Sequence, residues 1–249
     1  MKTYAILNSK GGVGKTTVSV NLGHGLALDG YKVLIVDSDI QDNIAVWLNV
    51  KPNNTTLFEV LTEDKLVSEA IINAREGLDI LPSGADYLGA VPYLFRKENK
   101  PVSSLKKSLE EVANNYDYCI IDCSPSRSLI HTVAIYASDG IIVPINMEWL
   151  SVYGSAQVKK ALDQVIDKYD IDVEIELVIP TFLDRRRSRA CDDILDSLKK
   201  HFKDRLSSPI RINSRISEAP GYGETVYELG DKRAIEDFDD IKERVIEID

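Results

Sequence analysis

Short apolar runs alternate with helical patterns along most of this chain. The runs of strand length occupy residues 4–7, 32–36, 78–81, 118–121, 140–145 and 173–179. Between them, apolar residues at helical spacing predict helices over 16–29, 103–115 and 150–169. Strands that are apolar throughout are buried on both faces. The pattern therefore predicts an α/β fold, with a mostly parallel twisted sheet, helices on both faces and right-handed crossovers.

Helical spacing recurs at the end of the chain. The apolar positions there are Ile235, Phe238, Ile241, Val245 and Ile248. Acidic side chains outnumber basic ones on the other faces of this segment. Because an acidic face is repelled by anionic lipid, we expect the helix to dock on the protein core and not on a membrane.

The composition is that of an ordinary globular protein. Of the 249 residues, 44% are hydrophobic and 28% charged, and there is neither an internal repeat nor a linker-like segment. We therefore expect residues 1–249 to form a single domain. Three cysteines are too few for a disulfide framework, and neither a signal peptide nor a membrane span is recognisable. These features predict a cytoplasmic protein.

The net charge of −10 conceals two unlike parts. Residues 185–215 carry ten basic and four acidic side chains, a balance of +6, and the remaining 218 residues sum to −16. A basic segment is typical of contact with a phosphate backbone, independent of base sequence. For Lys199 and Lys200 a solvated helix face explains the charges equally well.

A glycine-rich loop lies between the first apolar run and the first helix. Its residues are Lys10, Gly11, Gly12, Val13, Gly14, Lys15, Thr16 and Thr17. Glycines allow successive backbone N–H groups to face a phosphate, and the helix that follows directs its positive end at the same anion. In such a loop Lys15 reaches the β and γ phosphates and the Thr16 hydroxyl ligates Mg²⁺. The motif predicts an ATP site.

Carboxylates follow two of the apolar runs. Asp122 ends the run 118–121, and Asp37 and Asp39 follow the run 32–36. Open α/β sheets bind ligands at the carboxyl ends of their strands, so we expect these groups at the phosphate loop. Taken singly, each could instead cap a helix or face solvent in a loop.

The loop Lys10-Gly-Gly-x-Gly-Lys-Thr resembles the deviant Walker A motif of the ParA/MinD superfamily of P-loop NTPases. The resemblance implies that Lys10 contacts the nucleotide held by a partner subunit and that Lys10 and Lys15 are catalytic. It implies that Asp39 orients the attacking water, while Asp37 and Asp122 support Mg²⁺ through waters. This chain departs from the family pattern at Ile40, Asp42 and Arg127.

Two further segments resemble small ParA proteins. Residues 178–186 and 212–220 resemble family segments whose arginines bind DNA nonspecifically. The resemblance implies the same role for Arg186 and Arg215. By the same resemblance, Pro209 and Arg211 lie near adenine. The loop begins at residue 10, which leaves no room before it for a helix-turn-helix domain, so a small Soj-type form without specific DNA reading is expected.

The resemblance implies a DNA partition ATPase that uses ATP and Mg²⁺. ATP drives formation of a homodimer that binds nonspecific DNA, and a ParB-like or other cargo-bound protein stimulates slow hydrolysis and release. Such a protein is cytoplasmic, associates with the nucleoid when ATP is bound and does not bind membranes. The alternative is a MinD-like regulator associated with membranes.

Overall fold

The structure is a computed structural model that describes residues 1–39, 41–84, 102–125, 129–184 and 188–248. For residues 149–157 and 188–190 it describes only the backbone. The described residues form a seven-stranded sheet with the order β3-β4-β2-β5-β1-β6-β7. The strands are β1 (Lys2–Ile6), β2 (Val33–Ser38), β3 (Ile72–Arg75), β4 (Leu78–Leu81), β5 (Tyr118–Cys123), β6 (Gly140–Asn146) and β7 (Glu174–Thr181).

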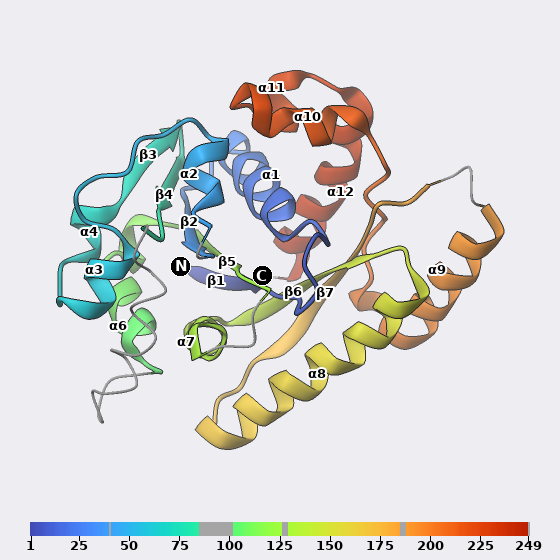
Figure 1. The fold of residues 1–249 in the computed structure, drawn as a ribbon, viewed down its shortest axis with the longest axis horizontal. Coiled ribbons are helices and arrows are strands. Elements are labelled where there is room, and N and C mark those ends of the chain that lie inside the picture. The colour runs from blue at the N-terminus through green and yellow to red at the C-terminus, as the bar shows by residue number, and fades with distance from the viewer. Residues whose placement is uncertain (40, 85–101, 126–128, 185–187, 249) are drawn as a thin grey trace.

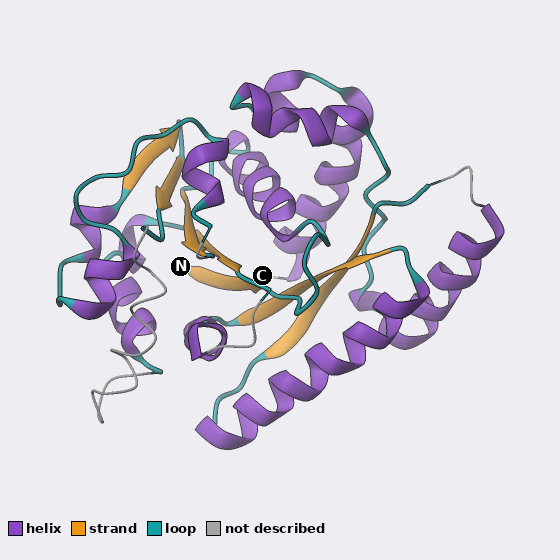
Figure 2. Ribbon diagram, in the orientation of Figure 1, coloured by secondary structure: helices purple, strands orange, loops and turns teal. Residues whose placement is uncertain are grey.

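The sheet is parallel except at one edge. Strand β3 pairs antiparallel with β4 through a tight turn at Gly77, and all other pairs are parallel. The strands twist progressively across the molecule (Figure 2). Strand β1 lies between β5 and β6, so the loop that follows β1 emerges beside the carboxyl ends of both neighbours.

Helices lie on both faces of this sheet (Figure 1). On one face are α1 (Lys15–Leu28), α2 (Asn43–Trp47), α10 (Ser214–Tyr222), α11 (Val226–Leu229) and α12 (Lys232–Ile248). On the other face are α3 (Leu57–Thr62), α4 (Val67–Ala70), α6 (Ser104–Glu110), α7 (Leu129–Ala137), α8 (Trp149–Tyr169) and α9 (Ser188–Phe202). Two short 3₁₀ helices, η1 (Ala113–Asn115) and η3 (Lys203–Arg205), follow α6 and α9.

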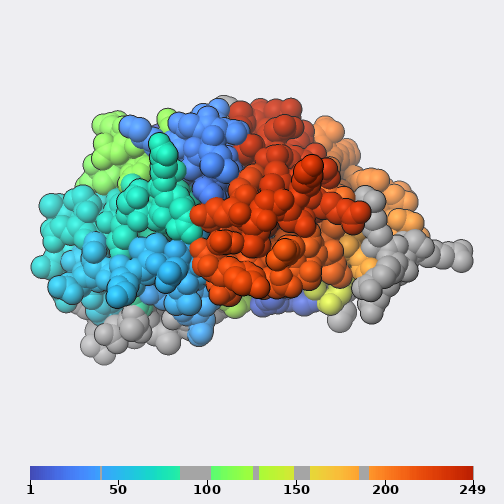
Figure 3. Space-filling model, turned by 90° about the horizontal axis from the view of Figure 1, so that it is seen from above, coloured from blue at the N-terminus to red at the C-terminus, as the bar shows by residue number. Residues whose placement is uncertain are grey.

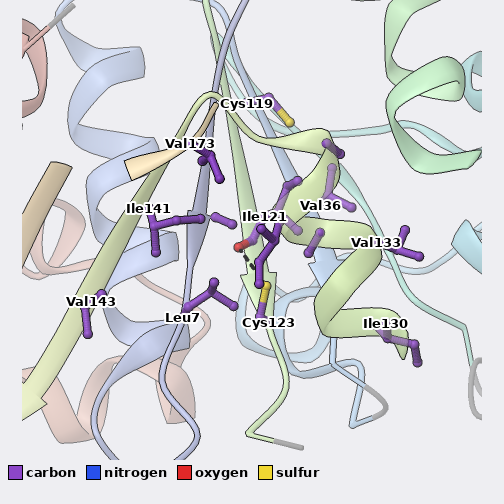
Figure 4. Packing of buried hydrophobic residues seen from close by; sticks show 14 of the residues in the cluster. Leu7, Val36, Cys119, Ile121, Cys123, Ile130, Val133, Ile141, Val143 and Val173 are labelled. Atoms are coloured by element: carbon purple, nitrogen blue, oxygen red, sulfur yellow. Dashed lines mark hydrogen bonds between the residues drawn. The ribbon is translucent and has the colours of Figure 1, made fainter. Parts of the chain in front are cut away.

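Alternate residues of each central strand enter two different hydrophobic clusters. In β5, Cys119 and Ile121 pack with α7, whereas Tyr118 and Ile120 belong to the cluster that contains α1 and α12. Figure 4 shows Ile121 and Cys123 on the same side of the sheet as Val133 of α7. The continuous apolar runs are therefore explained by burial on both faces.

The predicted α/β class is confirmed, and the six predicted strands are present with shifted ends. The continuous helix predicted over 103–115 is wrong, because α6 ends at Glu110 and η1 follows. Val112 leaves helical geometry, with φ −114° and ψ 3°, and the asparagines after it are poor helix formers. Strand β3 was missed because it has only four residues, which alternate apolar and polar and are partly or fully exposed, as an edge strand permits.

The expected docking of the C-terminal helix is confirmed. Phe238, Ile241 and Val245 of α12 are fully buried, and α12 packs against α1. In the space-filling view the C-terminal segments, coloured orange to red, lie directly against the blue and cyan segments of the N-terminal half (Figure 3). Among the described residues, no helix is both long and apolar enough to cross a membrane.

Candidate functional site

The glycine-rich loop joins β1 to α1 in an open, strongly curved conformation. Gly12 and Gly14 have φ of 70° and 89°, values in the left-handed region that favours glycine. Gly14 is the residue before the first helical residue, Lys15. The fixed point of the loop is Val13, which is fully buried and whose carbonyl oxygen accepts a 2.9 Å hydrogen bond from Thr181 Oγ1. The loop therefore curves around the first N–H groups of α1, as an anion site requires.

Lys15 lies under this loop. Its side chain is 7% exposed, and Nζ donates to the carbonyl oxygen of Lys10 at 3.4 Å. Burial lowers the pKa of Lys15, while the nearby Asp122 raises it. Buried charges are normally paired, and the hydrogen bond of this ammonium is long, so it can accept a further, anionic partner. A phosphate in the loop would supply that partner.

Two carboxylates meet directly below the N-terminus of α1. Asp37 on β2 and Asp122 on β5 are opposite each other in the parallel register, as expected from their positions at the strand ends. Asp122 Oδ2 accepts a 2.7 Å hydrogen bond from Thr16 Oγ1, and Ser19 Oγ lies 2.8 Å from Asp122 Oδ1. Asp37 accepts hydrogen bonds from the N–H groups of Asp39 and Ile44.

The electrostatics of this pair favour a bound cation. Burial, followed by the charge of Asp122, raises the pKa of Asp37 well above its usual range. Burial raises the pKa of Asp122 to about 6, against the hydrogen bonds from Thr16 and Ser19 and the charge of Lys15. Mg²⁺ takes oxygen ligands, commonly one or two carboxylates together with substrate phosphates. Thr16, Asp122 and Asp37 therefore fit Mg²⁺, which would relieve the mutual repulsion of the carboxylates.

Asp39 lies at the entrance of the same site. Its side chain is 7% exposed, and Oδ1 accepts a 3.1 Å hydrogen bond from the N–H of Gln41. Asp42, at a position where the resemblance leads one to expect glycine, has φ 48° and accepts hydrogen bonds from Ser83. Aspartate is one of the residues that tolerate this left-handed geometry. Ile40 and Arg127 lie outside the described residues.

Lys10 lies on the outer side of the loop. Its Nζ is 2.5 Å from Glu148 Oε2 and 3.3 Å from Asn146 Oδ1. Neither Asn146 nor Glu148 belongs to the motifs that predicted the site. Both follow the apolar run 140–145, so the strand-end rule that selected Asp37 and Asp122 could have found them.

A small cavity lies beside the loop at Thr17. We call it the Thr17 cavity; its lining includes Gly14, Thr17, Phe182, Ile210, Arg211 and Ile216. Arg211 contributes to this lining, but its guanidinium group is turned to α12, where it is 2.7 Å from Asp237. Pro209 is half-buried just before Ile210, whose N–H donates to the carbonyl oxygen of Pro180.

The basic residues predicted to bind DNA are only partly described. Arg215 lies in the first turn of α10, where Asn213 caps the helix by accepting the Arg215 N–H. The Arg215 side chain is 51% exposed and lies 3.5 Å from Glu218. Arg186 lies outside the described residues, so its place relative to Arg215 stays a prediction.

Comparison with known proteins agrees with this geometry. The family model described as an AAA domain matches residues 1–175. The sporulation initiation inhibitor protein Soj of Bacillus subtilis is 37% identical over 229 residues, which are 90% of each chain. The chromosome partitioning protein ParA of Caulobacter vibrioides is 34% identical over 232 residues, covering 91% of this chain and 86% of ParA.

Solved structures have the same fold over nearly the whole chain. Apo McdA of Cyanothece superposes with a TM-score of 0.88 at 25% identity, covering 98% of this chain and 99% of McdA. A putative plasmid partition protein of Borrelia burgdorferi bound to AMPPNP gives 0.84 at 25% identity, covering 99% and 98% of the two chains. The phosphate loop, the paired strand-end carboxylates and these relatives lead to one conclusion: the chain belongs to the ParA/Soj family of P-loop ATPases.

Proposed function

We propose that residues 1–249 act as a single ATPase domain that hydrolyses ATP to ADP and phosphate in DNA partition. The observation that carries this proposal is the convergence of Lys15, Thr16, Asp37 and Asp122 at one end of the sheet. Lys15 binds the phosphates, Thr16 with the two carboxylates holds Mg²⁺, and Asp39 orients the attacking water. Bound Mg²⁺ would stabilise the charge on the transferred phosphoryl group.

ATP binding, on this proposal, pairs two copies of the chain. Lys10 lies on the outer side of the loop, where its ammonium can reach a nucleotide held by a second copy. An arginine finger supplied to a phosphoryl-transfer site increases the rate by roughly 10³ to 10⁵, and Lys10 would act in a comparable way in trans. On this proposal the monomer hydrolyses ATP slowly, and pairing of two copies accelerates hydrolysis.

The ATP-bound dimer binds DNA without sequence preference through Arg215 and Arg186. Exposed Arg215, at the N-terminus of α10, suits a phosphate contact because helix N-termini and arginine both favour phosphate. A ParB-like or other cargo-bound protein then stimulates hydrolysis and releases the dimer from DNA. The protein acts in the cytoplasm and associates with the nucleoid while ATP is bound.

The MinD-like alternative requires a C-terminal helix that is free to bind lipid. In this chain the apolar face of α12 is already buried against the core. Membrane binding through that face would require α12 to leave its place. The burial therefore favours DNA over a membrane as the surface on which the dimer assembles.

One experiment tests these proposals together. Binding to a random-sequence DNA duplex is measured without nucleotide, with ADP–Mg²⁺ and with ATP–Mg²⁺, each at two salt concentrations. We expect binding only with ATP, and a steep loss of affinity at higher salt. Parallel tubes replace the DNA with anionic liposomes. Binding that does not depend on ATP, or ATP-dependent binding to liposomes and not to DNA, contradicts the proposed function.

A further inference from the structure

Lys10 is held by the end of the neighbouring strand. Its ammonium lies 2.5 Å from Glu148 Oε2 and 3.3 Å from Asn146 Oδ1. Lys10 follows β1, whereas Asn146 ends β6 and Glu148 directly precedes α8, and β1 and β6 are neighbours in the sheet. The hydrogen bonds of Lys10 thus join the outer side of the phosphate loop to the N-terminus of α8.

The backbone of Lys10 is fastened to the same strand. Its N–H donates to Asn8 Oδ1 at 2.9 Å, and Asn8 Nδ2 donates to the carbonyl oxygen of Pro144 at 2.7 Å. The hydrogen bond from Lys10 lowers the pKa of Glu148, so the carboxylate is charged at neutral pH. Lys10 and Glu148 therefore form an ion pair in the nucleotide-free chain.

We propose that Glu148, assisted by Asn146, is a latch that holds Lys10 within its own chain and opens when two ATP-bound copies pair. This inference rests on the proposed function, in which Lys10 contacts the nucleotide of the second copy. The ammonium cannot remain 2.5 Å from Glu148 while it extends away from its own chain. Pairing must therefore exchange the Glu148 carboxylate for the phosphates as the partner of Lys10.

The surroundings of the latch suit coverage by a second copy. Gly12, Glu148, Phe182 and Ile212 all line one open cavity of about 480 Å³. Phe182 and Ile212 are 42% and 53% exposed, which is unusual for large apolar side chains. Phe182 also has φ 59°, a strained value that a tertiary or quaternary contact must stabilise. A second copy placed on this face would bury both side chains where Lys10 is released.

The size of the effect follows from the exposure of the pair. The Lys10 and Glu148 side chains are 40% and 62% exposed, and exposed ion pairs shift an equilibrium by about 1.4- to 5-fold. A symmetric dimer opens two latches, so the two factors multiply. Removing the latch should lower the dimer dissociation constant by about 2- to 25-fold.

The test is the dimer dissociation constant at saturating ATP–Mg²⁺, measured by analytical ultracentrifugation. Glu148→Gln keeps the size of the side chain and removes its charge, and we expect tighter dimers within that range. ATP affinity under conditions in which the protein is monomeric should change less than twofold. An unchanged or weakened dimer overturns the latch.

Two control variants separate the latch from general charge effects. Asp184→Asn removes a carboxylate from the same cavity, whereas Glu174→Gln breaks an exposed ion pair with Arg205 at the opposite end of β7. Neither should strengthen the dimer as Glu148→Gln does. If Asp184→Asn has an equal effect, the cause is the charge of the cavity and the latch is overturned.

A second measurement does not depend on pairing. In the nucleotide-free protein, a ¹³C NMR titration of the Glu148 carboxyl should give a pKa that rises when Lys10 is replaced in Lys10→Met. An unchanged pKa overturns the ion pair on which the latch depends. A wild-type chain that stays monomeric with ATP refutes the proposed function and the latch with it. A wild-type dimer that Glu148→Gln leaves unchanged refutes the latch alone.

Discussion

Replacing Asp237 by alanine removes the anchor of the segment that lines the Thr17 cavity. The Asp237 carboxylate accepts hydrogen bonds from Arg211 Nε at 2.8 Å and from the Arg211 N–H at 2.9 Å, and Nη2 lies 2.7 Å away. The side chains are only 9% and 23% exposed. The resemblance places Arg211 near adenine, but this geometry makes its guanidinium a clamp between residues 207–213 and α12.

The cost of the substitution can be worked from these contacts. A hydrogen bond to a charged group contributes about 1.5–3 kcal/mol, and the backbone N–H left without an acceptor adds about 1 kcal/mol. The loss is therefore about 2.5–4 kcal/mol for Asp237→Ala. At about 2.1 cal/mol/K of unfolding entropy per residue, this lowers the Tm of the nucleotide-free protein by about 5–8 °C. Asp237→Asn keeps an acceptor and should lose about half as much.

Thermal unfolding followed by circular dichroism measures the shift, provided that unfolding is reversible. A Tm within about 1 °C of wild type for Asp237→Ala would refute the energetic argument. ATP affinity, measured well below both melting temperatures, tests the clamp itself. Arg211→Ala and Asp237→Ala should weaken ATP binding to the same extent, because each releases the same segment. A much larger loss for Arg211→Ala would show that its guanidinium contacts the nucleotide directly.

Three further predictions concern the remaining site residues. Asp39→Ala should give an ATP-bound dimer that stays on DNA without turnover, and phosphate release at the wild-type rate would contradict the role of Asp39. Arg215→Glu should abolish binding to random-sequence DNA in a gel-shift assay and leave ATP affinity intact; retained DNA binding would exclude this contact. Because Asp37 and Asp122 have raised pKa values in the folded chain, their contribution to stability is full below pH 4 and is lost as the pH rises through the folded values, about 6 for Asp122. Urea unfolding without Mg²⁺ should give a lower free energy of unfolding at pH 7.5 than at pH 5 in wild type, and a smaller difference in Asp122→Asn. An equal difference in the two proteins would refute the contribution of Asp122.

The phosphate site could be predicted from the sequence because it is built from short-range patterns. The loop 10–17 lies between a strand and a helix that are adjacent in the chain, and two of its glycines, Gly12 and Gly14, occupy left-handed positions. Asp37 and Asp122 are far apart in sequence. The rule that parallel strands end at one edge of the sheet nevertheless brings them together, and the register pairs them directly.

Other features depend on contacts that no local pattern encodes. Arginine commonly binds phosphate, so the sequence alone does not show that Arg211 has a partner within the chain. The position of α12 places Asp237 beside its guanidinium group. The break between α6 and η1 and the short edge strand β3 also depend on tertiary packing, because intrinsic propensity predicts secondary structure poorly where contacts with neighbouring elements dominate.

What the sequence by itself determined is the chemistry available: an α/β sheet buried on both faces, a phosphate loop and the carboxylates that serve it. The tertiary structure decided which of the charged side chains are already engaged. Lys10 meets Glu148, 138 residues further along the chain, only because β1 and β6 are neighbours in the sheet. The reason is physical: strand and helix patterns follow from local geometry and burial, whereas the partner of a long charged side chain depends on which strand ends the fold places beside it.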